Sequence, residues 1–307
     1  MPAVDDDLAT RGMVFDIERF AVHDGPGIRS LVFFKGCPLR CLWCSNPEGQ
    51  SNGIQIGFAR GNCIDCGKCA DVCPAEAISA SDQRIDRDRC VLCGACAAVC
   101  PSAALTMIGE EKSVADVLSV VKRDNAFYRR SGGGVTISGG EPLAQWRFLG
   151  ALLRALKAEH TTTAIETSGF SSETVIGDIV PLVDLVLLDI KHMDDARHRE
   201  GTGVSNSAIL RNARFVAASG SRMVVRIPVI PGYNDSTENI ALTAEFARGI
   251  GVKEIHLLPY HRLGLSKYAK LGMTYRLPDL APPPRDHLAS LARVVSSAGL
   301  VCSIGGM

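Results

Sequence analysis

Three cysteines fall within eight positions near the start of the chain, in the sequence KGCPLRCLWCSNPEG at residues 35–49. Cys37, Cys41 and Cys44 have the spacing C-x3-C-x2-C. A structural zinc site and an ordinary [4Fe–4S] cluster both take four protein ligands. Three thiolates would hold a cubane cluster and leave one iron without a protein ligand. We therefore expect a [4Fe–4S] cluster here whose fourth iron binds another molecule.

Eight further cysteines form an internal repeat, CIDCGKCADVCP at residues 63–74 and CVLCGACAAVCP at residues 90–101. Both runs have the spacing C-x2-C-x2-C-x3-C-P of bacterial ferredoxins, in which the fourth cysteine ligates the cluster of the other run. The repeat therefore predicts two auxiliary [4Fe–4S] clusters that carry single electrons. Their ligand sets are Cys63, Cys66, Cys69 and Cys100 for the first and Cys90, Cys93, Cys96 and Cys73 for the second. A pair of zinc knuckles is the alternative, but it requires neither the Cys-Pro end nor the crosswise pairing.

The composition of the 307 residues sets the class of protein. Lysine plus arginine equals aspartate plus glutamate at 33 each, so no net charge attracts the chain to nucleic acid or to an anionic membrane. The apolar run VPLVDLVLLDI at residues 180–190 is too short to span a bilayer, and the start of the chain is acidic where a signal peptide would be basic. We expect a cytoplasmic protein and a monomer. Clustered cysteines in the cytosol indicate metal binding rather than disulfides.

The remaining sequence alternates short apolar runs with longer amphipathic ones. Seven runs are strand-like, at residues 30–36, 134–140, 162–168, 185–191, 223–230, 254–260 and 300–306. Four helix-length stretches lie between them, at residues 113–130, 144–160, 205–220 and 236–251. Strands separated by helices pair in parallel. The pattern predicts an α/β fold, a partial (β/α)6 TIM-like barrel interrupted by a ferredoxin-like domain.

This interpretation divides the chain into three parts. The barrel takes residues 12–51 and 109–307, the double-cluster insert takes residues 52–108, and residues 1–11 form an N-terminal tail. In such barrels the chemistry gathers at the C-terminal ends of the strands. The motifs that follow the predicted strands lie at residues 35–37, 138–141, 166–168, 189–191 and 259–261. We expect these motifs to meet on one face.

The motif SGGEP at residues 138–142 suits an amino acid ligand. Gly139 and Gly140 let the backbone approach a ligand closely, and the Glu141 carboxylate accepts hydrogen bonds from an ammonium group. An amino acid would bind the open iron through its amine and carboxylate. We therefore expect this motif to lie beside the three cysteines.

Together these motifs resemble a known family. CPLRCLWC with SGGEP resembles the radical S-adenosylmethionine superfamily, and HDGPGIRSLVFFKGCPLRCLWCSNPEG at residues 23–49 resembles the activating enzymes of glycyl radical enzymes. The resemblance continues through ETSG at 166–169, LLDIKHM at 187–193, RIPVIPGYND at 226–235 and LLPYHRLG at 257–264. The insert is similar to that of the subgroup serving diol dehydratases, choline lyase and arylacetate decarboxylase. The compact activase of pyruvate formate-lyase lacks it.

The resemblance implies roles for individual residues. Adenosylmethionine would chelate the open iron of the catalytic cluster held by the first three cysteines. The residues around it would be Trp43 at the adenine, Gly139, Gly140 and Glu141 at the methionyl amine, Asp189 and Lys191 at the methionyl end, with Lys191 toward the carboxylate, and His261 packed nearby. Some of these residues also have an ordinary structural interpretation: Asp189 and Lys191 could form a surface ion pair, and His261 could be a loop histidine. The lone Cys302 is expected to be a buried structural thiol.

Two further implications concern a cation and the partner. Glu166 and Thr167 match a position where compact activases place an acid and a threonine around a monovalent cation. This chain has glutamate where those have aspartate, so the cation is left open, and the alternative role for Glu166 is a cap of the following helix. Asp24 and Arg29, in the segment DGPGIR, are candidate contacts to a peptide of the partner, with a simple turn as the alternative for Asp24.

The expected activity is that of a radical oxidoreductase. The chain would cleave adenosylmethionine reductively and abstract a hydrogen atom from one glycine Cα of a glycyl radical enzyme, with flavodoxin or ferredoxin as electron donor. The expected partner is a glycerol- or propanediol-type dehydratase. Two other functions stay open. One is a radical enzyme acting on a small molecule or another peptide. The other is an electron-transfer iron–sulfur protein.

Overall fold

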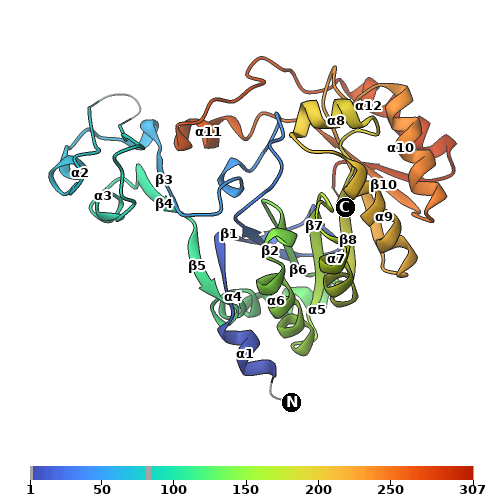
Figure 1. Cartoon of the computed structure of the whole chain (residues 1–307), viewed down its shortest axis with the longest axis horizontal. Coiled ribbons are helices and arrows are strands. Elements are labelled where there is room, and N and C mark those ends of the chain that lie inside the picture. Colours follow the sequence, from blue (N-terminus) through green and yellow to red (C-terminus); the bar gives the residue numbers. More distant parts are fainter. Residues whose placement is uncertain (1–2, 81–83, 307) are drawn as a thin grey trace.

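A computed structural model describes residues 3–80 and 84–306 (Figure 1). Nine strands form its main sheet: β1 Arg11–Ala21, β2 Arg29–Phe34, β5 Glu110–Ser113, β6 Gly134–Gly139, β7 Thr162–Thr167, β8 Leu185–Asp189, β9 Met223–Val229, β10 Glu254–Pro259 and β11 Val301–Ile304. Their order is β11-β10-β9-β8-β7-β6-β2-β1-β5. β2 and β6 to β11 pair in parallel, and β1 pairs antiparallel with β2 and β5. This is the mostly parallel sheet of a partial barrel.

All seven predicted strands are present, as β2 and β6 to β11. The parallel part therefore has one strand more than the expected (β/α)6 arrangement. The two antiparallel strands, β1 and β5, were not among the predicted elements. β1 alternates between more and less exposed residues along much of its length, as expected of a strand near the edge of a sheet.

Most helices of the barrel part cover the outer face of the main sheet, whereas α11 packs against the strand at residues 55–58 (Figure 1). The helices of this part are α4 Val114–Val121, α5 Asn125–Ser131, α6 Trp146–Ala158, α7 Glu173–Ile179, α8 Asp195–Thr202, α9 Ser207–Ala218, α10 Thr237–Gly249, α11 Leu265–Leu271 and α12 Arg285–Ser297. Three of the predicted helical stretches form α6, α9 and α10. The stretch 113–130 is divided into α4 and α5 by a 3-10 turn at Lys122–Asp124, where the buried Asp124 carboxylate pairs with Arg19.

α6 shows how the sequence places a helix on the sheet. Its leucines at positions 149, 152, 153 and 156 are buried in the main hydrophobic core, together with Ile137 of β6 and Ile165 of β7. The spacing of these leucines by three and four residues forms one apolar stripe. The helix therefore fixes two neighbouring strands whose ends carry predicted site residues.

The N-terminal segment is not a simple tail. Residues Ala3–Ala9 form helix α1, which packs against α4 and α6, and the Asp7 carboxylate pairs with Arg154 at 2.5 Å. Residues 1 and 2 of the expected tail, residues 81–83 of the expected insert and residue 307 lie outside the described part of the chain. The boundaries proposed from the sequence stay a prediction.

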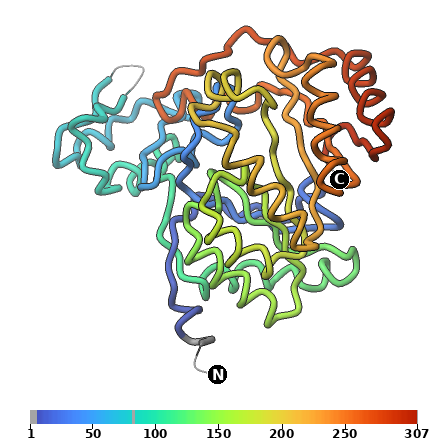
Figure 2. Tube along the Cα trace, turned by 45° about the vertical axis from the view of Figure 1, so that its right-hand side comes forward, coloured from blue at the N-terminus to red at the C-terminus, as the bar shows by residue number. Residues whose placement is uncertain are grey.

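The cysteine-rich segment lies to one side of the main sheet in both views (Figures 1 and 2). It contains a two-stranded antiparallel sheet, β3 Gln55–Phe58 with β4 Leu105–Ile108, and two short helices, α2 Lys68–Asp71 and α3 Ala95–Ala98. The two helices begin in the same way, after Gly67 and Gly94, both with φ of +77°. The two cysteine runs therefore repeat in structure as well as in sequence.

No helix in the described ranges is long and apolar enough to cross a membrane.

Candidate functional site

One cavity of about 310 Å³ lies at the C-terminal ends of the parallel strands. It collects residues from the ends of β2, β6, β7, β8 and β10, as the barrel interpretation predicted. The predicted residues that line it are Asp24, Cys37, Cys41, Trp43, Cys44, Gly139, Gly140, Glu141, Glu166, Thr167, Asp189, Lys191 and His261. Segments more than 200 residues apart in sequence, at Asp24 and His261, thus meet around one space.

The three cysteines of this cavity suit a metal cluster. Burial raises the pKa of the Cys37 and Cys41 thiols to about 12, so these thiolates need a compensating positive charge. Within the described residues no cysteine forms a disulfide, and no three cysteine, histidine or acidic side chains converge as around a single metal ion. In a cubane each thiolate binds a different iron, so its ligands surround the cluster without meeting at one point. The residues present therefore fit a [4Fe–4S] cluster.

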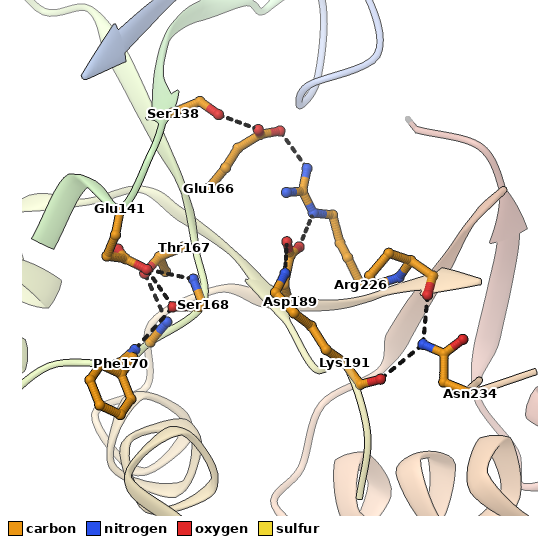
Figure 3. A network of polar contacts seen from close by, with 12 residues as sticks. Ser138, Glu141, Glu166, Thr167, Ser168, Phe170, Asp189, Lys191, Arg226 and Asn234 are labelled. Atoms are coloured by element: carbon orange, nitrogen blue, oxygen red, sulfur yellow. Dashed lines mark hydrogen bonds and ion pairs between the residues drawn. The ribbon is translucent and has the colours of Figure 1, made fainter. Parts of the chain in front are cut away.

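Glu141 is the anchor of the loop that follows β7 (Figure 3). Its carboxylate is buried and accepts hydrogen bonds from Thr167 Oγ1 at 2.6 Å, Ser168 Oγ at 2.5 Å, Ser168 N at 2.8 Å and Leu143 N at 3.2 Å. Burial raises the pKa of Glu141, and these donors oppose the rise. Four donors match the acceptor positions of a carboxylate. The structure thus gives Glu141 a positioning role that the sequence did not show.

Four charged side chains that line the cavity contact one another in turn, namely Glu166, Arg226, Asp189 and Lys191 (Figure 3). Arg226 on β9 contacts Glu166 through Nη1 and Asp189 Oδ1 through Nε, the latter at 2.9 Å. Lys191 Nζ lies 3.0 Å from Asp189 Oδ2. The side chains of Arg226 and Lys191 are only 9% and 10% exposed, so the surface-pair interpretation of Asp189 and Lys191 is wrong.

This network fixes the charge of its members. Burial alone would favour the neutral form of Asp189, but Arg226 and Lys191 outweigh it and hold the pKa of Asp189 below its ordinary value. Burial likewise disfavours the charged form of Lys191, and Asp189 outweighs it, so the pKa of Lys191 is raised. Burial and the nearby Glu166 raise the pKa of Asp24 to about 7. Arg226 and Lys191 therefore stay positively charged in the cavity.

Glu166 has different partners from those of a helix cap. Ser138 Oγ donates to its Oε2 at 2.6 Å, and Arg226 contacts its Oε1. The following helix, α7, is capped by Ser172, whose hydroxyl accepts a hydrogen bond from Val175 N. The cap interpretation of Glu166 is therefore wrong.

Arg29 lies outside the cavity, unlike the other candidate residues of the barrel. It is buried, and its guanidinium donates to Thr136 Oγ1 at 2.6 Å and to the carbonyl of Val135 at 2.8 Å. Asp24 does line the cavity, and its carbonyl accepts a hydrogen bond from Thr136. The position of Arg29 supports a structural role beneath this loop rather than contact with a partner.

Trp43 and His261 occupy different surroundings in the cavity wall. Trp43 is buried and packs on Tyr233, with ring centroids 4.7 Å apart, and it belongs to the same hydrophobic cluster as Tyr260. His261 is exposed at the end of β10 and lines the cavity from its rim. Cys302, on the outermost strand β11, is half-buried rather than fully buried.

The first of the two predicted crosswise sets of cysteines lies around one space. Cys63, Cys66, Cys69 and Cys100 line one small cavity, the set expected for the first auxiliary cluster. In the second set, the Cys90 and Cys73 thiols both act on the pKa of Cys96, which burial raises. Arg84, which sequence analysis missed, donates from Nη2 to Cys69 Sγ at 3.8 Å.

Sequence analysis also missed Arg226, Ser138 and Ser168. A signal for Arg226 was present, since a charged residue interrupts the apolar run MVVRIPVI. The two serines lie within the predicted strand-end motifs at 138–141 and 166–168, but their individual roles depend on carboxylates that are distant in sequence.

Comparison with known proteins places this geometry in a family. The model of the radical SAM superfamily matches residues 31–244. The isethionate sulfite-lyase activating enzyme of Nitratidesulfovibrio vulgaris is 48% identical over 271 residues, covering 85% of this chain and 88% of that protein. The choline trimethylamine-lyase activating enzyme of Oleidesulfovibrio alaskensis is 43% identical, with 87% and 89% covered. The (2S)-3-sulfopropanediol dehydratase activating enzyme of Klebsiella oxytoca is 39% identical, with 96% and 97% covered.

These matches agree with the three-cysteine cavity and with the order of the motifs around it. They extend over nearly the whole length of each relative, so the similarity is not limited to one domain. The chain belongs to the radical SAM superfamily and, within it, to the activating enzymes of glycyl radical enzymes.

Proposed function

We propose that this chain activates its partner by reductive cleavage of adenosylmethionine and removal of a hydrogen atom from one glycine Cα. The observation that carries this proposal is the single cavity in which Cys37, Cys41 and Cys44 meet Lys191 and the SGGE loop. When bound, the cluster and adenosylmethionine supply one electron and a deoxyadenosyl group that accepts the glycine hydrogen. Methionine and 5′-deoxyadenosine are the products, and the unpaired electron stays on the glycine.

The protein's own contribution is binding, orientation and exclusion of water. The three cysteines would hold the cluster next to the C-terminal end of β2, with Trp43 beside the adenine. Lys191 offers a buried positive charge to the methionyl carboxylate. Gly139 and Gly140 bring backbone to the amine, while Glu141 holds the opposite loop in place. A walled cavity protects a reactive carbon radical from solvent.

We propose that the cysteine-rich segment carries two auxiliary [4Fe–4S] clusters with the crosswise ligands given above. The four cysteines around one small cavity support the first ligand set. The second is supported by the nearness of Cys73 and Cys90 to Cys96, whose pKa is raised by burial and by both of these thiols. These clusters would receive electrons from a ferredoxin or flavodoxin and serve the catalytic cluster.

The partner is proposed by chemical class. Sequence analysis favoured a glycerol- or propanediol-type dehydratase. The three relatives described above are named for isethionate sulfite-lyase, choline trimethylamine-lyase and sulfopropanediol dehydratase, and these names refer to small hydroxylated substrates. A further relative that is 39% identical is named for indoleacetate decarboxylase, so the hydroxylated kind is the commoner one but not the rule. We therefore propose a glycyl radical lyase or dehydratase that acts on a small alcohol, the propanediol type among them.

Iron content and electron paramagnetic resonance test this proposal. Anaerobic reconstitution should give about 11 to 12 irons per chain, and the combined change of Cys37, Cys41 and Cys44 to alanine about 8. Cys302→Ala, which removes the lone cysteine, is the matched control and should keep the full iron content. A triple variant that kept its full iron content and still cleaved adenosylmethionine would refute the site assignment.

The partner is tested with a panel of glycyl radical enzymes of the named kinds, each mixed anaerobically with the chain, a reductant and adenosylmethionine. Activation should produce the glycyl radical doublet. A partner labelled with deuterium at the glycine Cα should transfer that deuterium to 5′-deoxyadenosine. If no member of the panel does so while adenosylmethionine is cleaved, the proposed class of partner is wrong, and action on a small molecule or another peptide takes its place.

A further inference from the structure

The place where the family resemblance suggested a monovalent cation is occupied by a side chain of the protein. The resemblance put a cation beside Glu166 and Thr167. In the structure the Arg226 guanidinium lies between the carboxylates of Glu166 and Asp189 and contacts both. Its side chain is 9% exposed, and it lines the same cavity. The residues present therefore do not fit a bound cation.

The oxygens that would ligate a cation are already engaged. Glu166 contacts Arg226 through Oε1 and accepts from Ser138 through Oε2. Asp189 accepts from Arg226 through Oδ1 and from Lys191 through Oδ2. The Thr167 hydroxyl donates to Glu141 at 2.6 Å and accepts from Gly169 N at 2.9 Å. Hard cations need several free oxygen ligands.

The charges are balanced without an added ion. Two carboxylates, Glu166 and Asp189, face two cations, Arg226 and Lys191, and all four side chains are at least four-fifths buried. Two other carboxylates line the cavity, those of Asp24 and Glu141. The pKa of Asp24 is raised to about 7, so it is largely neutral below that pH. Burial also raises the pKa of Glu141, and its oxygens already accept four hydrogen bonds. A guanidinium is always charged and presents a planar fork that suits two carboxylates at once.

We propose that Arg226 is a built-in counter-ion that takes the place of a monovalent cation, so that this chain binds adenosylmethionine without K⁺ or Na⁺. The inference rests on the proposed binding of adenosylmethionine in this cavity. Arg226 acts as a positioning residue: it holds Asp189, which in turn holds the Lys191 ammonium. An ion would be exchangeable and dependent on its concentration, whereas the guanidinium is present in every molecule.

Binding of adenosylmethionine to the reconstituted full chain, measured by equilibrium dialysis without any partner, tests the proposal. K⁺ and Na⁺ are replaced by tetramethylammonium at constant ionic strength and then added back. The dissociation constant of the wild-type protein should change by less than about twofold, which is under 0.5 kcal/mol. A saturable tightening of about tenfold or more on addition of K⁺ or Na⁺ would overturn the proposal.

Arg226→Gln provides the second arm. It leaves Glu166 and Asp189 without their shared partner, so binding in tetramethylammonium should weaken about tenfold or more, and K⁺ should restore part of the loss. Arg222→Gln is the matched control, since it removes an exposed arginine beside the same strand and should behave as wild type. A folded Arg226→Gln protein that binds weakly in every salt would contradict the proposal.

Unfolding of the cluster-free proteins gives a readout that needs no bound cofactor. K⁺ should raise the Tm of Arg226→Gln and leave the Tm of wild type and Arg222→Gln unchanged. A K⁺-dependent rise in the Tm of the wild-type protein would contradict the proposal that Arg226 takes the place of a cation. If Arg226→Gln does not fold, the wild-type titrations still decide the question. Failure to activate any glycyl radical enzyme would refute the proposed function but leave these partner-free measurements unaffected.

Discussion

Asp189 occupies the centre of the charged chain in the cavity, and Asp189→Asn is the most direct test of that arrangement. The substitution keeps the shape of the side chain and removes its negative charge. It leaves the Arg226 guanidinium and the Lys191 ammonium with one fewer counter-charge in a buried site. We therefore expect a loss of stability even in protein without clusters.

The size of the loss follows from the contacts. Asp189 makes two ionic contacts, at 2.9 Å to Arg226 and 3.0 Å to Lys191, and its side chain is 20% exposed. Removing one partner from a buried ionic group typically costs about 3–5 kcal/mol. In a domain of this size each kcal/mol lowers the Tm by about 2–4 °C, so a fall on the order of 10 °C is expected.

Thermal unfolding of the cluster-free chain at pH 7 measures this loss. Glu200→Gln is the control, because Glu200 forms an exposed ion pair with Arg197 at 3.2 Å, and such pairs contribute about 0–1 kcal/mol. Equal and small effects of the two substitutions would refute our account of the buried network. Because the pKa of Asp189 is depressed in the folded state, its stabilisation is present above about pH 4 and is lost as the pH falls through the folded pKa. The difference from wild type should therefore shrink in acid.

Three further predictions concern other parts of the molecule. The pKa of Asp24 is raised to about 7 in the folded state, so wild-type stability should fall as the pH rises from about 4 to 7. Asp24→Asn should therefore be more stable than wild type at pH 8, as measured by chemical denaturation. Equal stability at pH 8 would contradict the raised pKa of Asp24. Arg84→Gln removes a charged donor to Cys69 Sγ and should lower the potential of the first auxiliary cluster by on the order of 50 mV in a redox titration; an unchanged potential would exclude this contact. Thr167→Val removes one donor to Glu141 and should cost about 1–3 kcal/mol of unfolding free energy; a loss below about 0.5 kcal/mol would show that the loop does not depend on it.

The parallel core of the fold was predictable from sequence because six of its seven strands are largely buried on both faces, the outermost strand β11 being partly exposed. Such strands appear as continuous apolar runs, and all seven runs are strands in the structure. β1 alternates in burial and pairs in the opposite direction, so it lacks that signal. Helix α1 was expected as a tail, because its packing on α4 and α6 cannot be inferred from seven residues taken alone.

The candidate site was predictable where a motif directly follows a strand. The ends of parallel strands meet at one edge, which is why Cys37, Glu141 and Asp189 share a cavity. Contacts between side chains on different strands were not predictable in the same way. Arg226 faces two acids 37 and 60 residues away, and Arg29 turns inward to carbonyl groups of the neighbouring strands.

The two ends of the cysteine-rich segment meet at one point of the barrel. Gln55 at the start of β3 is paired with Ile108 at the end of β4, and the Lys35 ammonium donates to the Gln55 side chain at 2.9 Å while its stem packs against Gly109. A segment whose ends are neighbours can be gained or lost without moving the strands that flank it. In evolutionary terms, we expect the segment to behave as a unit inserted into the barrel, where β3 also packs against α11. A short linker in its place should therefore leave the barrel able to fold, and the same unit should be transferable to a compact activase.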